Sequence, residues 1–230
     1  MSGRIFLFGT IATALMLGSS APALQQPTPD PSRPVSVFVL DLAGDGYQLT
    51  SVEGGVMFDI DGTGKPIQVG WTASGADDGF LFLDTNGNGR VDSGRELLGN
   101  GWRLPDGSRS LSGDGALISI QGYPVPPPNP LPRGIGNVDP ADQVFKNIRF
   151  WCDLNHNGQS EPDELKTLSE LNIARVPAGF GRLGRKPDER GNIMLNEGGF
   201  FVMKQGVEVF HGMLEVVFAR RGQASLPSLL

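Results

Sequence analysis

Short apolar segments separated by clusters of glycine and aspartate constrain the fold of this chain more than any other feature. From Val35 onward the strings VSVFVL, YQLTSV, GVMFDI and GFLFL each run for five or six residues and then stop at a turn. Runs of this length, bounded by turn residues, are typical of β-strands. The 33 glycines and 18 prolines among 230 residues agree with a chain rich in turns. The first half is therefore predicted to be a meander of strands.

Two segments in the middle of the chain predict helices. In DPADQVFKNI (residues 139–148), Asp139 suits an N-cap and Pro140 suits the first helical position, while the apolar residues share one face. A second helix is predicted to begin near Pro162, because its leucines form an apolar stripe that ends near Ile173.

The C-terminal part returns to strand patterns. The strings NIMLN, GFFVMK, GVEVFHG and MLEVVFA predict strands, with a hairpin turn at Gln205-Gly206. Residues 101–133 are predicted to hold turns and then an extended, exposed proline cluster. The predicted fold class is α+β, with a strand meander, hairpins and two or three short helices around the loops described below.

The N-terminal 23 residues predict a secretory signal peptide. They contain one arginine, an apolar run from Ile5 to Leu17, and small residues at Ala21 and Ala23. The run is shorter than the roughly 20 residues that span a bilayer. We therefore expect cleavage, no stable membrane insertion afterwards, and a location in the periplasm or outside the cell. Residues 24–34 are predicted to be a proline-rich linker, 35–222 the folded domain, and 223–230 a disordered tail.

Charge and the rare reactive residues exclude several classes of function. The formal net charge is −6 and the basic residues are scattered, so we expect no binding to nucleic acid. Cys152 is the only cysteine, which rules out an intramolecular disulfide, and its apolar neighbours favour a buried structural thiol. No Ser-His-Asp order or zinc-ligand spacing is present. The chain is therefore not expected to be an enzyme, and the sequence names no protein partner.

The segment that begins at Asp153 has the spacing of a calcium loop. Loops of the EF-hand type supply side-chain oxygens from positions 1, 3 and 5, a backbone carbonyl from 7 and a bidentate Glu from 12, with glycine at 6. Counted from Asp153, every position is filled, and Ser160 at position 8 is the only departure from the usual apolar residue. The predicted ligands are Asp153, Asn155, Asn157, the carbonyl of Gln159 and Glu164, with Glu161 at position 9. An Asx-type turn before a helix is the alternative, but it does not explain Glu164.

A second loop, which begins at Asp84, matches the same pattern with a shift at its end. Arg95 stands at position 12, where a cation ligand is needed, and Glu96 follows one residue late. The loop must therefore be distorted, for example at Gly94, unless Asp92 ligates directly. The predicted ligands are Asp84, Asn86, Asn88, the carbonyl of Arg90, Asp92 and Glu96.

Two further stretches are incomplete. DIDGTG offers Asp59 and Asp61 but has Gly70 at position 12, while DLAGDG offers Asp41 and Asp45 with Ala43 at position 3. These residues either lend carboxylates to a shared ion, together with Asp77 and Asp78, or form ordinary hairpin turns. The sequence leaves both interpretations open.

The phrases VLDLAGDGYQLTS, DDGFLFLDTNGNG and WCDLNHNGQSEPDELKTL together resemble one known module. They are similar to the EF-hand-like calcium-binding region of large secreted RTX-type bacterial proteins, including their calcium-triggered self-processing modules. The resemblance covers about residues 35–176 and implies calcium binding and calcium-dependent folding. This chain lacks the long glycine-aspartate repeat arrays of those proteins, and its proline cluster stands where a further Asp-rich loop is often found.

The resemblance also implies an alternative activity. In self-processing relatives an aspartate attacks its own carbonyl at an Asp-Pro bond, which leads to cleavage or to a cross-link with a lysine. Asp30-Pro31 lies near the corresponding place, though further upstream of Asp41 than the family spacing suggests. The main prediction is a calcium-binding protein whose Ca²⁺ is structural or regulatory, and self-cleavage or cross-linking at Asp30-Pro31 is the alternative.

Overall fold

The computed structural model describes residues 34–123, 136–179 and 181–222. The predicted signal peptide, the Asp30-Pro31 bond, the proline cluster and the predicted tail lie outside these residues. None of the helices in the described part is long and apolar enough to cross a membrane.

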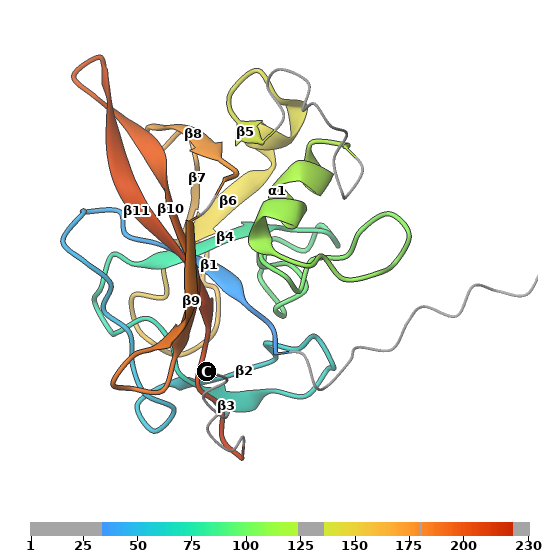
Figure 1. The fold of residues 1–230 in the computed structure, drawn as a ribbon, viewed down its shortest axis with the longest axis vertical. Helices are drawn as coiled ribbons and strands as arrows, with labels where there is room; N and C mark the ends of the chain where they lie inside the picture. Colours follow the sequence, from blue (N-terminus) through green and yellow to red (C-terminus); the bar gives the residue numbers. More distant parts are fainter. Residues whose placement is uncertain (1–33, 124–135, 180, 223–230) are drawn as a thin grey trace, which may run out of the picture.

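A curled antiparallel sheet forms the centre of the molecule (Figure 1). Strand β1 (Val37–Leu40) pairs on one side with β11 (Val207–Val217) and on the other with β4 (Gly79–Leu83). The remaining strands extend the sheet in both directions. Beyond β4 lie β6 (Ile148–Trp151) and β7 (Leu165–Thr167); beyond β11 lie β10 (Ile193–Lys204), β8 (Ile173–Pro177) and β5 (Asn137–Val138), and β9 (Gly181–Pro187) also pairs with β10. A separate ribbon consists of β2 (Val56–Phe58) and β3 (Ile67–Val69).

The α+β prediction is wrong, because the described residues form mostly β-structure. They include one α-helix, α1 (Gly113–Ile120), and one 3-10 turn, η1 (Gln143–Lys146). Helix α1 lies in a segment that was predicted to hold only turns. Ser112 caps it by accepting a hydrogen bond from the Gly115 amide at 3.2 Å. Because glycine has a low helix propensity, the glycines of this segment gave no indication of a helix.

Strand pairing replaces the two predicted helices. The helix expected after Pro162 is instead β7 and a turn, because Leu165 pairs with Trp151 across the β6–β7 ladder. Leu168 and Ile173 are buried, as the apolar stripe predicted, but they belong to a strand–turn–strand unit and not to a helix. The helix expected at residues 139–148 is reduced to η1, because Ile148 already belongs to β6.

Most of the predicted strands are confirmed. Strands β1, β2 and β4 fall inside the predicted strings, and β10 and β11 form the predicted C-terminal hairpin. Its turn is at Gln205-Gly206, where both residues have positive φ and Lys204 pairs with Val207. The string YQLTSV forms only an isolated bridge between Leu49 and Thr72.

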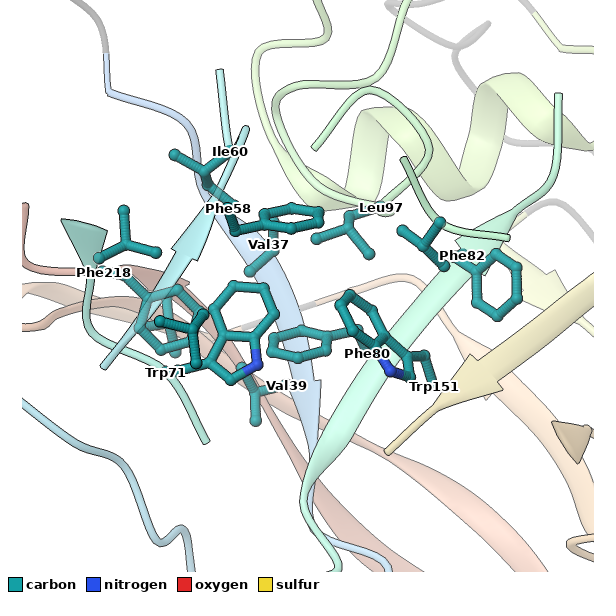
Figure 2. Close-up of a cluster of buried hydrophobic side chains, with 14 of the residues drawn as sticks. Val37, Val39, Phe58, Ile60, Trp71, Phe80, Phe82, Leu97, Trp151 and Phe218 are labelled. Carbon is teal, nitrogen blue, oxygen red and sulfur yellow. The ribbon is translucent and has the colours of Figure 1, made fainter. Parts of the chain in front are cut away.

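Both faces of the sheet are buried against separate apolar clusters. Along β1, Val37 and Val39 face one cluster, and Phe38 and Leu40 face the other, which also holds Leu117 of α1. A strand buried on both faces reads as an unbroken apolar run, which explains the string VFVL. The first cluster is aromatic (Figure 2), with a centroid distance of 5.6 Å between the rings of Trp71 and Trp151. Two rings of this cluster, those of Trp71 and Trp151, contact the acidic loop that begins at Asp153.

Candidate metal-binding loops

The Asp153 loop closes the hairpin between β6 and β7. The Asp153 side chain is buried and accepts hydrogen bonds from the amides of Asn157 at 3.0 Å and Gly158 at 2.8 Å. Gly158 has φ of 72°, and a Cβ there would lie 2.9 Å from the carbonyl oxygen of Met57. Glycine is therefore required at position 6 for both conformation and space.

Two buried tryptophans hold the first and last carboxylates of this loop. The indole Nε1 of Trp71 donates to Asp153 Oδ2 at 2.9 Å, and that of Trp151 donates to Glu164 Oε2 at 3.2 Å. Asp153 is 1% exposed and Glu164 is 3% exposed. The aromatic core therefore fixes the two ends of the loop relative to each other.

The middle of the loop turns its polar side chains toward the same carboxylates. The side-chain amides of Asn155 and Asn157 donate to Glu161 at 3.4 and 2.8 Å. The Glu164 carboxylate accepts from the backbone amides of Asn155 and Glu161. The structure thus brings together the predicted side chains at positions 1, 3, 5, 9 and 12, while Gln159 at position 7 donates its amide to Asn157 Oδ1 at 2.7 Å.

The surroundings of the two glutamates shift their pKa values in opposite directions. Burial raises the pKa of Glu164, although the hydrogen bond from Trp151 opposes this shift. The hydrogen bond from Asn157 lowers the pKa of Glu161. Glu164 is therefore a carboxylate whose ionised form the fold desolvates, and a cation beside it would offset that cost.

The Asp84 loop repeats this arrangement between β4 and the next segment. Asp84 accepts hydrogen bonds from the amides of Gly87 at 2.7 Å and Gly89 at 2.8 Å. The side-chain amides of Asn86 and Asn88 donate to Asp92 at 2.8 and 2.6 Å, as the asparagines of the other loop do to Glu161. The amide of Arg90 donates to Asn88 Oδ1 at 2.9 Å, which matches the contact of Gln159.

Glu96 occupies the place that Glu164 has in the other loop. Its carboxylate accepts from the amides of Thr85 at 3.1 Å and Asp92 at 2.9 Å, and the residue is 3% exposed. The Glu96 carbonyl accepts from the Leu83 amide at 2.9 Å, just as the Glu164 carbonyl accepts from the residue before Asp153. The one-residue shift therefore leaves the terminal acid inside the loop.

Gly94 accommodates the extra residue. Its amide donates to the carbonyl of Asp59 at 2.9 Å, and a Cβ at this position would lie only 1.9 Å from the carbonyl oxygen of Ile60. Any other residue would push the backbone away from the DIDGTG turn. Arg95, which falls at position 12 by count, is exposed.

The two loops are paired at position 8. The amide of Val91 donates to the hydroxyl of Ser160 at 2.7 Å, and both residues are buried. The unusual Ser160 thus supplies the contact between the loops. A cleft of about 350 Å³ lies beside this contact and is lined in part by Asp59, Asp92 and Glu161.

The two incomplete stretches, DIDGTG and DLAGDG, differ in how their aspartates are engaged. Asp59 accepts hydrogen bonds from the amides of Thr63 and Gly64 within its own turn, and Asp61 forms a salt bridge with Arg220 at 2.7 Å. These two residues therefore behave as parts of a hairpin turn. Asp41, Asp45, Asp77 and Asp78 gather at a separate place, at the ends of β1 and β4.

The reactive side chains near the loops have structural partners. Burial raises the pKa of Cys152 to about 12, which disfavours the thiolate, and its Sγ donates to the carbonyl of Ala76 at 3.2 Å. The ring nitrogens of His156 each lie 2.7 Å from a backbone carbonyl, of Thr72 and of Gly54. The sequence did not indicate the roles of Trp71, Trp151 and Ser160. The one available signal was the position of Ser160, which deviates from the usual loop pattern.

The loop pairing can be tested by replacing Ser160 with alanine. Ser160→Ala leaves the buried Val91 amide without its acceptor, so the free energy of unfolding should fall by about 1 to 3 kcal/mol in urea denaturation. Ser93→Ala is the control, because the Ser93 hydroxyl accepts only a long contact of 3.4 Å in the same loop. Equal stability of Ser160→Ala and the parent chain would contradict the pairing.

Comparison with known proteins places the chain in a family. It is similar to the iron-regulated protein FrpA of Neisseria meningitidis serogroup C, with 34% identity over 163 residues, which cover 70% of this chain and 14% of FrpA. The chain thus spans about one seventh of that relative. The name of FrpA describes iron regulation and states no catalytic activity. Residues 38–121 and 133–219, which include both loops, match the SPM domain, and the chain belongs to the SPM domain family.

Proposed function

We propose that this chain is a calcium-binding protein of the periplasm or the extracellular space, whose paired loops bind calcium for structural or regulatory purposes. The observation that carries the proposal is the shared hydrogen-bond pattern of the Asp153 and Asp84 loops. In each loop, one aspartate, two asparagine amides, an acid at position 9 and a terminal glutamate converge. The two indoles and the Val91–Ser160 contact fix this arrangement in place.

The donor set favours a hard cation. Each loop offers three carboxylates and two amide side chains, and all of these ligate through oxygen. Oxygen donors suit calcium and magnesium, whereas zinc and copper favour the imidazole and thiol groups that are engaged elsewhere at this site. A calcium ion accepts six to eight oxygens in flexible geometry, which agrees with two loops that differ by one residue in length.

The expected affinity is low. Asparagine at positions 3 and 5 reduces the charge of each loop, and extracellular modules of this kind bind calcium with dissociation constants of about 0.1 to 1 mM. At about 1 mM calcium and a dissociation constant of about 0.1 mM, one site adds about 1.4 kcal/mol to the stability. This is a sizeable fraction of a typical total of about 5 to 15 kcal/mol.

Calcium should therefore raise the melting temperature. An excess of calcium over chelator should raise it by about 3 to 6 °C per site in a chain of this size. Asp153→Asn should remove the increment that belongs to its loop, because the amide supplies a weaker ligand at position 1. Asp163→Asn is the matched control, since Asp163 belongs to the same loop but is exposed. Equal melting temperatures of the parent chain in calcium and in chelator would contradict the proposal.

The register of the second loop can be tested separately. Glu96→Gln should weaken binding to the Asp84 loop about tenfold or more, because a carboxylate ligand is lost. Arg95→Gln should leave the affinity within about twofold, although Arg95 is the residue at position 12 by count. Calcium calorimetry of both variants in the Asp153→Asn background removes the contribution of the Asp153 loop, so a difference between the two variants belongs to the Asp84 loop. Wild-type affinity in Glu96→Gln would show that the loop binds no calcium through Glu96.

A further inference from the structure

A second group of acids lies at the junction of β1 and β4. Asp41 follows β1 directly and Asp78 precedes β4 directly, and the ladder that pairs Leu40 with Gly79 brings these two ends side by side. Ligand oxygens of Asp41, Asp45 and Asp77 all lie within 4.8 Å of one another. This group uses none of the residues assigned to the paired loops.

Backbone amides hold these carboxylates together. Asp41 accepts from the amides of Gly44 at 2.6 Å and Gly46 at 2.9 Å, and Asp77 accepts from the amide of Ala43. These donors orient the carboxylates but carry no full positive charge. Among the described residues, neither lysine nor arginine forms an ion pair with any of the four aspartates. The repulsion within the group is therefore not balanced by a basic side chain.

Asp78 is a second observation that points to a ligand at this place. The residue is 1% exposed, and its Oδ2 accepts from the Gln48 amide of the Asp41–Gln48 loop at 2.6 Å. Its Oδ1 is buried and has no hydrogen-bond partner in the described part of the chain. A buried carboxylate oxygen without a partner is costly, so something positive is expected beside it.

Tyr47 and His211 are two further polar side chains near the cluster. The Tyr47 hydroxyl is buried without a hydrogen-bond partner in the described residues, and burial together with Asp41, Glu197 and Asp78 raises its pKa. A phenol held neutral in this way offers no positive charge. His211 is buried, and its Nδ1 lies 3.4 Å from the backbone carbonyl of Asp41. Its contact is therefore with the main chain at this place.

We propose that Asp41, Asp45 and Asp77, backed by Asp78, form a separate site for a divalent cation, with calcium as the ion that fits best. Calcium binds oxygen at about 2.3 to 2.6 Å, so two ligands on opposite sides of one ion lie about 4.6 to 5.2 Å apart. The oxygens of Asp41, Asp45 and Asp77 lie within 4.8 Å of one another, close enough for one ion to contact all three. Magnesium, with ligands at about 2.0 to 2.1 Å, needs opposite oxygens about 4.0 to 4.2 Å apart and near-ideal octahedral geometry.

The site also explains how an incomplete stretch can still bind. In DLAGDG the third position is Ala43, which has no side-chain oxygen, but its backbone amide holds the Asp77 carboxylate next to Asp41 and Asp45. Asp77 comes from a distant part of the chain and supplies an oxygen that the stretch lacks. The same segment contacts the Asp153 loop through the Gly75 amide, which donates to the Leu154 carbonyl at 3.0 Å. A cation here would therefore order the connection between β1, β4 and that loop.

Calcium calorimetry on the purified chain tests this site. The parent chain should bind one calcium more than Asp77→Asn and one more than Asp45→Asn, because each variant replaces a charged ligand by a weaker neutral one and leaves the hydrogen-bonded turn intact. Asp163→Asn removes the same charge elsewhere and should keep the full stoichiometry. Far-UV circular dichroism in chelator checks that each variant is folded. Asp45 is exposed, so its variant keeps the test valid even if Asp77→Asn does not fold.

The outcome is separable from that of the paired loops. The site is supported if Asp45→Asn binds one calcium fewer than the parent chain and still binds the calcium ions of the two paired loops. Those ions are identified by their loss in Asp153→Asn and in Glu96→Gln. The site is also supported if the paired loops bind nothing and the one calcium of the parent chain disappears in Asp45→Asn. Full stoichiometry and unchanged affinities in a folded Asp45→Asn chain overturn it, whatever the paired loops do.

Discussion

Two hydrogen bonds from buried indoles to buried carboxylates connect the core of this protein to its acidic loops. Trp71 and Trp151 belong to the aromatic cluster under the sheet, and their Nε1 atoms hold Asp153 and Glu164. An indole has one N–H donor, and it needs a partner when the ring is buried. The same contacts thus complete the core and fix the first and last acids of the loop. A change in the conformation of the loop is therefore expected to alter the packing of the two tryptophans, and a change in that packing to alter the loop.

The second loop depends on the first through a small number of contacts. The Val91–Ser160 hydrogen bond joins the loops, and Gly94 lets the longer loop pass close to the Asp59 turn. Strands, and not helices, enter both loops, so the pair is carried by hairpins of the sheet. Helices are therefore not needed to bring these oxygens together. What is needed is a twelve- or thirteen-residue loop whose ends are fixed by strand pairing.

The sequence predicted the local features well and the long-range features poorly. The strands of β1, β4 and the β10–β11 hairpin follow from short apolar strings and a turn with two positive φ values, which are properties of neighbouring residues. The helix expected after Pro162 was wrong because the leucine spacing fits a helix face as well as a strand followed by a turn. Only the pairing of Leu165 with Trp151 decides between them, and this contact is not visible in a local pattern.

The same division holds for the candidate sites. The residues that converge in each loop follow from their spacing, including the inward Glu96, whose place the structure shows through its contacts with Thr85 and Asp92. The partners that come from elsewhere in the chain could not be predicted. Trp71 is 82 residues from Asp153, and Asp77 is 34 residues from Ala43. Such contacts depend on the register of the whole sheet.

Tryptophan fluorescence can show whether a cation binds where the indoles hold the loop carboxylates. In a Trp102→Phe chain the two remaining tryptophans are Trp71 and Trp151, so the emission reports on these two hydrogen bonds. Calcium should change the emission in a saturable way at about 0.1 to 1 mM, and chelator should reverse the change. The same titration of Trp102→Phe with Asp153→Asn should need a clearly higher calcium concentration. Identical emission with calcium and with chelator would contradict the account.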